Sequence, residues 1–317
     1  MICVLAGGVG AARFLAGLQL VVDPAEIVAI VNVGDDFDLH GLAISPDLDT
    51  VTYTLAGAVN PDTGWGLVGE TWSAMQALER YGGATWFRLG DQDLATHLYR
   101  TQRRNDGAPL SVVTAEIAAA WRLGLRLVPV TDDPVRTMVT LAESGDEITF
   151  QEYFVHRQHS IAVSAVRFEG AERSRPAPGV IDAIADAEIV VVAPSNPIVS
   201  IGPVLAVPGV RAAIESRRED CVAVSPIVGG AALKGPADRM LRELGHEASV
   251  EGVARLYRSL ARTLLVDEVD AASAEAVRAA GMEPLVAPSI MSSPERAAAL
   301  ARTVLASARR TSPGAGS

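Results

Sequence analysis

The sequence has very little lysine and cysteine. Of its 27 basic residues only Lys234 is a lysine, and arginine supplies the others. Cys3 and Cys221 are the only cysteines, and each lies in an apolar, strand-like run. Two isolated thiols in apolar runs are typical of buried free cysteines in a reducing compartment. We therefore expect no disulfide and a cytoplasmic protein.

The sequence also lacks long apolar runs and an excess of positive charge. No run of about 18 apolar residues is free of proline, glycine and charge, and no export signal is recognisable at the N-terminus. The formal net charge is −11, whereas a nucleic-acid-binding protein needs a basic face. We expect a soluble protein that binds neither membranes nor nucleic acid. Anionic small molecules remain compatible with this charge, because helix N-termini and local basic groups can bind them.

A glycine-rich turn follows the first apolar run, Ile2 to Leu5, which is typical of a buried parallel strand. Gly7, Gly8 and Gly10 form the turn, but no Gly-Lys-Ser/Thr follows, which excludes a Walker A loop. Arg13 stands where a dinucleotide fingerprint has its third glycine. A strand-to-helix turn of this kind directs N–H groups and the helix dipole at an anion. It predicts a phosphate or diphosphate site, with a tight turn and a surface arginine as the alternative.

Strand-like and helix-like segments alternate along the chain. The strand candidates lie within residues 2–5, 26–33, 125–134, 187–197, 221–230 and 250–268, with weaker candidates at 147–156 and 161–170 that would form an edge excursion. Such alternation predicts an α/β fold with a doubly wound, mainly parallel, Rossmann-like sheet. In such sheets ligands bind beyond the carboxyl ends of the strands, where the unusual loops of this sequence also fall.

The domain organisation follows from the same pattern. We expect a single domain over residues 1–310, with a helix-rich insert at about 60–125 and a last amphipathic helix at about 293–310. The final residues, 311–317, predict a disordered tail, because they are small, polar and rich in glycine.

An acidic loop at residues 34–50 follows the second strand candidate. It contains five aspartates: Asp35, Asp36, Asp38, Asp47 and Asp49. Carboxylates at this density repel one another unless solvent or a cation neutralises them, and oxygen ligands beside a phosphate site suit Mg²⁺. The alternative is ordinary turn and cap chemistry, which aspartate also favours. His40 in the same loop is either a site residue or a hydrogen-bonding loop residue.

Residues 86–102, WFRLGDQDLATHLYRTQ, predict a helix with a polar face. Asp91 or Asp93 can cap this helix, and Asp93 shares a face with His97 at a spacing of four. Arg88 precedes the cap, where it could hold an anion or a carbonyl group of a ligand. The alternative is a capped helix with a solvated basic end.

Two further loops, 193–203 and 225–238, follow strong strand candidates and contain small and hydroxyl residues. Asn196 could bind the edge of a nucleobase through its paired donor and acceptor. Lys234 lies in the second, glycine-rich loop, where it is either a phosphate ligand or a surface lysine.

Taken together, these segments resemble the 2-phospho-L-lactate transferase (CofD) family, most closely its actinobacterial form. The resemblance rests on AGGVGAARFL, VNVGDD, HGLAISPDLDTVTYTLAG, WGLVGETW, RLGDQDLATHLYRTQ, VTDDPVRT, APSNPIVSIGP and VSPIVGGAALKGPA, in order from residue 5 to residue 237. The family makes precursors of coenzyme F-420. It transfers a phosphorylated three-carbon acid from a guanosine diphosphate ester to the deazaflavin Fo, and GMP leaves.

The resemblance implies roles for particular residues. The implied nucleotide-binding residues are Gly7, Gly8, Gly10, Arg13, Ser195, Asn196, Gly229 and Gly230. Asp35 and Asp49 match positions near a Mg²⁺ ion. The implied deazaflavin-binding residues are Asp49, Arg88 and His40, and Asp49 or Asp36 would position or deprotonate the attacking hydroxyl. The family likeness also implies a homodimer.

Three alternatives remain open on the sequence. The transferred acid could be phosphoenolpyruvate or 2-phospholactate; the actinobacterial likeness favours the former. A non-enzymatic, nucleotide-sugar-binding regulator of the related gluconeogenesis factor family shares the glycine loop. It would not need SPDLDT and RLGDQDLATH, the segments that the likeness links to the deazaflavin. An NAD-dependent dehydrogenase is disfavoured by the missing third glycine and by the lack of an isolated acidic residue about 20 positions after the loop.

Overall fold

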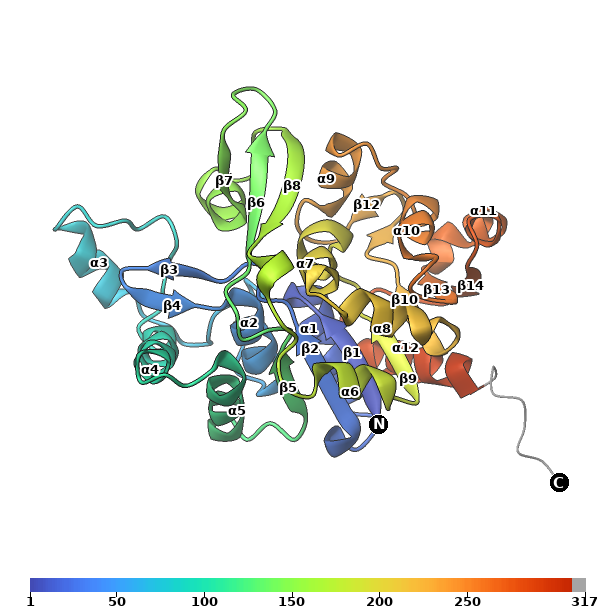
Figure 1. Cartoon of the computed structure of the whole chain (residues 1–317), viewed down its shortest axis with the longest axis horizontal. Helices are drawn as coiled ribbons and strands as arrows, with labels where there is room; N and C mark the ends of the chain where they lie inside the picture. The colour runs from blue at the N-terminus through green and yellow to red at the C-terminus, as the bar shows by residue number, and fades with distance from the viewer. Residues whose placement is uncertain (310–317) are drawn as a thin grey trace.

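The computed structural model of this protein describes residues 1–309 and is built around a seven-stranded sheet (Figure 1). All neighbouring strands of the sheet are parallel. In spatial order the strands are β14 (Glu283–Val286), β13 (Thr263–Val266), β10 (Cys221–Val224), β9 (Ile189–Val192), β1 (Ile2–Ala6), β2 (Ile27–Val31) and β5 (Arg126–Pro129). The predicted doubly wound α/β fold is confirmed. The predicted tail at 311–317 lies outside the described residues.

The centre of the sheet is formed by its most apolar segments. Every residue of β1, β2 and β9 is buried. Val4 lies between Ala29 on one side and Val191 on the other, so β1 is covered by a strand at both edges. Such uninterrupted apolar runs are expected where helices cover both faces of a parallel sheet. The order reverses between β1 and β9, which places the switch point of the sheet beside the glycine-rich turn.

Helices flank this sheet (Figure 1). They include α1 (Gly8–Leu18), α2 (Pro46–Leu55), α6 (Val180–Ala185), α7 (Gly202–Ala206), α8 (Val210–Ser216), α9 (Ala237–Glu243), α10 (Val250–Tyr257), α11 (Ala274–Ala279) and α12 (Pro294–Arg309). Helix α1 packs against both α2 and α12. At the crossing with α12, a Cβ on Gly17 would lie 2.3 Å from the backbone carbon of Ala297. A glycine is therefore required for the close approach of these two helices.

A separate antiparallel sheet projects from the central one and is labelled at the top of Figure 1. It consists of β6 (Arg136–Leu141), β7 (Glu147–Thr149) and β8 (Val163–Glu169). The prediction of a strand over 147–156 is wrong in its second half, where residues Glu152–His156 form a π-helical turn. Phe150, Tyr153 and Phe154 follow helical rather than alternating spacing, and Tyr153 is buried in the small core of this sheet.

The acidic segment 34–50 is more regular than the predicted loop. It forms a hairpin of β3 (Phe37–Leu39) and β4 (Leu42–Ile44), and helix α2 then begins at Pro46. Asp47 and Asp49 lie in the first turn of α2. Proline favours the first helical position because its fixed φ matches that of a helix. Aspartates favour the first turn because their negative charge interacts with the positive end of the helix dipole.

Three helices, α3 (Ser73–Glu79), α4 (Asp93–Asn105) and α5 (Leu110–Ala120), lie within the stretch predicted to be rich in helix. The starts of α3 and α4 are capped reciprocally. The carboxylate of Asp91 accepts hydrogen bonds from the amides of Ser73 and Ala74 on α3. Glu70 accepts from the amides of Gln92 and Asp93 on α4. The prediction that Asp91 or Asp93 caps the following helix is therefore wrong.

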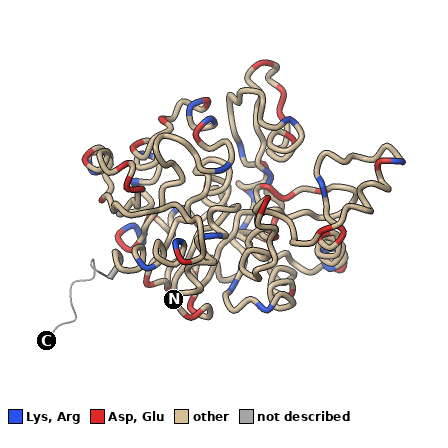
Figure 2. The backbone as a smooth tube through the Cα atoms, turned by 180° about the vertical axis from the view of Figure 1, so that it is seen from behind, with Lys and Arg blue, Asp and Glu red and all other residues tan. Residues whose placement is uncertain are grey.

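Acidic and basic residues alternate in short stretches over the described part of the chain (Figure 2). Among residues 1–309, no single helix has both the length and the apolar content to cross a membrane. One bent pair, Pro197–Ala206 with Val210–Ser216, meets that test by length and composition only, and its two parts are bent by 97°.

Candidate functional site

A cavity of about 700 Å³ opens at the switch point of the sheet. Its walls come from segments that are far apart in the sequence. They include residues 7–13, the start of α2, 63–66, 87–88, 150–155, 194–200, 225–237 and 289–292. A cavity of this size at this place in a doubly wound sheet is the expected ligand site.

The glycine-rich turn forms one end of the cavity. Helix α1 begins directly after Gly7, and Gly10 packs so closely against the next loop that a Cβ there would lie 2.1 Å from the carbonyl oxygen of Pro194. The hydroxyl of Ser195 donates a hydrogen bond to the carbonyl oxygen of Gly7 at 2.7 Å. The turn after β1 and the turn after β9 are thus joined. The predicted residues Gly7, Gly8, Gly10, Arg13, Ser195 and Asn196 all line the cavity.

Asn196 is used differently from the prediction. Its side-chain oxygen accepts hydrogen bonds from the amides of Ile198 at 2.9 Å and Val199 at 3.4 Å, which caps the turn that follows. This oxygen is therefore engaged by the protein itself. The side-chain nitrogen donates to Sδ of Met240 at 3.9 Å. A paired donor and acceptor for a nucleobase is therefore not the arrangement in this structure, and the second N–H of the amide is the group left for a ligand.

Two buried carboxylates, Asp35 and Asp47, lie beside the glycine-rich turn. Asp47 accepts a hydrogen bond from the side-chain amide of Asn32 at 2.9 Å and another from the amide of Gly8. Burial outweighs these bonds and raises the pKa of Asp47 to about 6. The sequence predicts Asp47 only as one of five aspartates. It gives no signal for Asn32, because the orientation of this side chain depends on the packing of distant segments.

Asp35 fits a site for a divalent cation. Its side chain lines the cavity, is buried, and has one oxygen, Oδ1, without a hydrogen-bond partner among the described residues. Burial, and next the charges of Asp47 and Asp36, raise the pKa of Asp35 well above its ordinary value. A cation removes this penalty, and Mg²⁺ binds through one or two carboxylates together with ligand phosphates. Asp35, one of the two predicted Mg²⁺ ligands, therefore fits such a site, and Asp47 rather than the predicted Asp49 is the second carboxylate that the electrostatics place near it.

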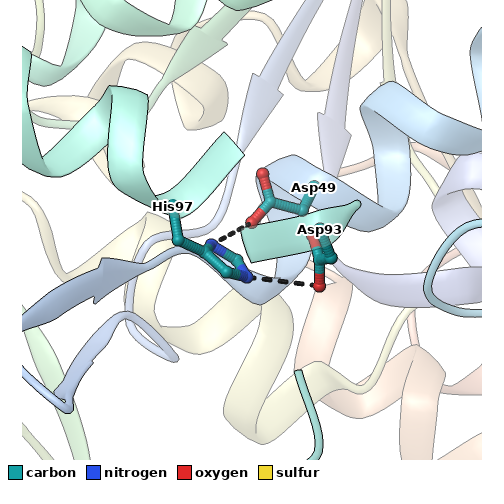
Figure 3. Close-up of side chains that lie close together, drawn as sticks. All are labelled: Asp49, Asp93 and His97. Carbon is teal, nitrogen blue, oxygen red and sulfur yellow. Dashed lines mark ion pairs between the residues drawn. The ribbon is translucent and has the colours of Figure 1, made fainter. Parts of the chain in front are cut away.

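Asp49 lies in a buried network of charged side chains (Figure 3). Arg100 donates to both carboxylate oxygens of Asp49, one of them at 3.1 Å, and both side chains are buried. His97 lies between two acids, with Nδ1 3.7 Å from Asp49 and Nε2 3.2 Å from Asp93. Tyr53 donates to the other oxygen of Asp93 at 2.6 Å. Arg100 fixes the position of the Asp49 carboxylate, and Asp93 and Tyr53 extend the network through His97.

The contacts of His97 favour one tautomer of its ring. Its Nδ1 lies 3.2 Å from a guanidinium nitrogen of Arg100. Because a guanidinium can only donate, this contact suits the tautomer that accepts at Nδ1 and carries a proton on Nε2. Nε2 lies 3.2 Å from Asp93 but is buried without a well-aligned hydrogen-bond partner among the described residues. Asp49, Asp93 and His97 could hold a metal ion by their mutual distances. The positive charge of Arg100 next to Asp49 disfavours a second cation there. The ion pair of Arg100 with Asp49 therefore fits these contacts better than a metal site does. A carboxylate has further lone pairs, and the predicted metal and catalytic roles of Asp49 stay predictions.

The other end of the cavity is aromatic. Tyr53, Phe87, Phe150 and Phe154 line it, whereas Trp65 lines the cavity from the loop at 60–66, which contacts Lys234. The rings of Phe150 and Phe154 stack with centroids 5.4 Å apart. These aromatic residues are not among the predicted ligand contacts, although the spacing of four between Phe150 and Phe154 places them on one helical face. An aromatic wall of this kind suits a flat ring system.

Arg88 lines the same end of the cavity, as predicted for a ligand contact. Its guanidinium lies over the ring of Trp72, 4.1 Å from the centroid. This cation–π contact orients an otherwise exposed arginine at the cavity edge.

Four predicted site residues do not reach this cavity. Asp36 lines a neighbouring cavity of about 310 Å³, accepts a hydrogen bond from Ser45 at 2.7 Å, and has its pKa raised by burial to about 8. His40 is exposed in the turn of the β3–β4 hairpin. Gly229 and Gly230 form the turn between the short strands β11 (Ile227–Val228) and β12 (Ala231–Ala232). Because these two strands pair with each other, their hairpin determines where the turn lies.

The fold and this site define a doubly wound α/β protein with one large cavity at the switch point of its sheet. The profile of the family described as 2-phospho-L-lactate transferase CofD matches residues 2–298. The chain belongs to this family. It is 47% identical over 308 residues to a phosphoenolpyruvate transferase of Streptomyces griseus, covering 96% of this chain and 97% of that protein.

Other similar proteins agree. A phosphoenolpyruvate transferase of Mycolicibacterium smegmatis is 41% identical, covering 96% of this chain and 97% of that protein. A solved structure from Bacillus halodurans, described as a member of the UPF0052 family, is 16% identical with a TM-score of 0.62 and covers 96% of this chain and 98% of that one. At this identity the likeness concerns the fold alone.

Proposed function

We propose that this protein is a transferase of coenzyme F-420 biosynthesis. It moves phosphoenolpyruvate or 2-phospholactate from a guanosine diphosphate ester to the ribityl hydroxyl of the deazaflavin Fo. GMP is released, and the product is dehydro-F-420-0 or F-420-0. The proposal is supported by membership of the CofD family and by relatives named phosphoenolpyruvate transferase.

The observation that carries the proposal is one cavity lined by two chemically different sets of residues, one polar and glycine-rich and the other aromatic. The glycine-rich turn with Asp35 and Asp47 suits a diphosphate and its cation. The aromatic wall that includes Phe87 and Phe150 suits the tricyclic deazaflavin. A group-transfer enzyme needs its two substrates next to each other, and a single cavity satisfies this requirement.

In the proposed reaction, the ribityl oxygen forms a bond to the phosphorus that carries the three-carbon acid. The bond from that phosphorus to the bridging oxygen of GMP breaks, and GMP leaves with the electron pair. The hydroxyl proton passes to a carboxylate, for which Asp49 is the proposed acceptor. Asp49 is held in one orientation by Arg100, so it would position the hydroxyl before transfer.

Mg²⁺ is proposed as the cofactor, held by Asp35 together with Asp47 rather than with Asp49, whose carboxylate is paired with Arg100. When bound, it would neutralise charge on the diphosphate during phosphoryl transfer. The N-terminus of α1 and Arg13 would bind the phosphate oxygens that face the glycine-rich turn.

The three-carbon acid is proposed to be phosphoenolpyruvate, because the similar actinobacterial proteins carry that name. A homodimer is also proposed, on the family likeness. Sedimentation velocity tests it: a species of twice the chain mass of 33.2 kDa supports the dimer, and a monomer at all concentrations contradicts it.

The reaction itself gives the direct test. The protein is incubated with Fo, Mg²⁺ and the guanosine diphosphate ester of either acid, and products are measured by mass spectrometry. Formation of dehydro-F-420-0 or F-420-0 with an equal amount of GMP supports the proposal. Absence of product with both esters, combined with tight binding of a nucleotide sugar, would instead support the regulator considered above.

A further inference from the structure

Three cationic side chains of arginine or lysine line the cavity, and two of them converge. Arg88 lies at the aromatic end over Trp72. Arg13 and Lys234 both lie close to Gly64. A Cβ atom built on Gly64 would lie 2.8 Å from Nζ of Lys234 and 3.9 Å from Nη2 of Arg13. Two cations therefore meet near one point beside the glycine-rich turn.

These two cations have no counter-charge from the protein. Among the described residues, the polar contact of Lys234 is a hydrogen bond donated to the carbonyl oxygen of Thr63 at 3.4 Å, and neither it nor Arg13 forms an ion pair with a carboxylate. Burial and next the charge of Arg13 lower the pKa of Lys234. Elsewhere in the chain arginines are commonly paired, as Arg103 is with Glu116. An uncompensated pair of like charges at a cavity mouth is the arrangement that a multiply charged anion stabilises.

We propose that Lys234 and Arg13 form a clamp for the diphosphate group of the bound nucleotide. The inference rests on the proposed function for the identity of the nucleotide. It chooses between the two alternatives that the sequence leaves open for Lys234, a phosphate ligand and a surface lysine, and pairs this lysine with Arg13. Arg13 reaches the diphosphate from α1, and Lys234 reaches it from the segment between β12 and α9. The contact of Lys234 with Thr63 keeps the loop at 60–66 next to the same anion, so this loop covers the diphosphate end of the cavity.

Amine acylation tests the clamp, because Lys234 is the only lysine in the chain. The purified protein is treated with sulfo-NHS-acetate, and the acetylation rates of Lys234 and of the amino terminus are followed by mass spectrometry. The amino terminus is the internal control, since Met1 pairs with Glu188 away from the cavity. Rates are compared without ligand and with saturating GDP, inorganic pyrophosphate or guanosine, each with Mg²⁺, and binding is measured in parallel by calorimetry.

We expect GDP and pyrophosphate to slow acetylation of Lys234 at least fivefold, guanosine to have little effect, and the amino terminus to react equally throughout. If GDP binds while Lys234 reacts at its free rate, the clamp is wrong and the transferase proposal stands. If neither GDP nor pyrophosphate binds, both proposals are contradicted. If guanosine protects as well as GDP, the base rather than the diphosphate contacts Lys234, and the clamp is again contradicted.

Variants provide a second measurement. Lys234→Met should weaken GDP binding about 10-fold, the effect of losing one charge-assisted contact, whereas Lys234→Arg should stay within about threefold of wild type. Arg302→Met, on the exposed face of α12, is the matched control and should leave GDP affinity unchanged. Unchanged GDP affinity in Lys234→Met would contradict the clamp.

Discussion

At the scale of single residues, the ion pair of Arg100 with Asp49 is the most consequential contact of the site. Both side chains are buried, and the residues are separated by 51 positions in the sequence. Removal of one partner leaves the other charge buried without compensation, which destabilises a protein far more than removal of the whole pair. The contact therefore determines both stability and the orientation of Asp49.

The pair gives a stability prediction. Arg100→Gln should lower the free energy of unfolding by about 3–5 kcal/mol, because Asp49 is left buried and unpaired. Arg103→Gln on the same helix is the matched control, since its pair with Glu116 is partly exposed to solvent and contributes far less. Urea denaturation of both variants measures the difference. Equal destabilisation by the two substitutions would contradict the structural account of this network.

Asp35 gives a prediction that separates activity from stability. Asp35→Asn should lower transfer activity by about 100-fold or more, because a cation ligand is lost. The same change should leave the melting temperature unchanged or higher without Mg²⁺, because it removes a buried carboxylate that faces Asp47. Asp38→Asn is the control, since Asp38 is exposed and pairs with Arg136. Full activity of Asp35→Asn would rule out its role as a ligand.

At the scale of elements, the starts of α3 and α4 depend on each other through Asp91 and Glu70. Asp91 has its pKa lowered from 3.8 to about 2, first by the hydroxyl of Thr71 and next by the amides of Ala74 and Ser73. A lowered pKa means that the ionised form is favoured in the folded state. The stabilisation of α3 is therefore complete above about pH 4 and is lost as the pH falls towards 2.

Hydrogen exchange measures this dependence. Amides of residues 73–79 should lose protection between about pH 4 and pH 2, after correction for the intrinsic exchange rate. In Asp91→Asn the protection should already be reduced at pH 7 and should change little over the acidic range, because the amide does not titrate. If wild type and Asp91→Asn show the same pH profile, the cap does not stabilise α3.

Elements that are determined by residues close together in the sequence could be predicted more fully than elements that depend on distant residues. The strand at Ile2, the glycine-rich turn and the alternation of strands and helices follow from short-range patterns, and the fold was predicted correctly. The start of α2 also has local signals in Pro46 and Asp47, which the loop prediction overlooked. The turn after β7 lies in a run rich in aromatic and β-branched residues, which favours a strand, although Phe150 and Phe154 have helical spacing.

The site was predictable only in part, for the same reason. The turn at Gly7 and the carboxylate of Asp35 are next to strand ends, so their place at the cavity followed from the fold. The pairing of Asp49 with Arg100 and the cap of α4 by Glu70 join residues that are distant in the sequence. No local pattern specifies such contacts, because they depend on how the elements pack.

At the scale of the whole molecule, the two ends of the cavity have different roles in the proposed reaction. Arg88→Ala should weaken binding of Fo about 10-fold and leave GDP affinity nearly unchanged, because Arg88 lies at the aromatic end. Arg80→Ala is the control, since Arg80 is exposed and does not line the cavity. Calorimetric titration of both ligands into each variant gives the answer. Weakened GDP binding with unchanged Fo binding would mean that the two ends are assigned in reverse.

The most direct test of the central claim is a fluorescence titration of Fo into the protein with Mg²⁺, in the presence and absence of GDP. We predict saturable binding of one Fo per chain, and binding that persists or tightens when GDP fills the other end of the cavity. Calorimetry of the same mixtures should give independent stoichiometries for both ligands. Absence of Fo binding under all of these conditions, or displacement of Fo by GDP, would contradict a cavity built to hold both substrates at once.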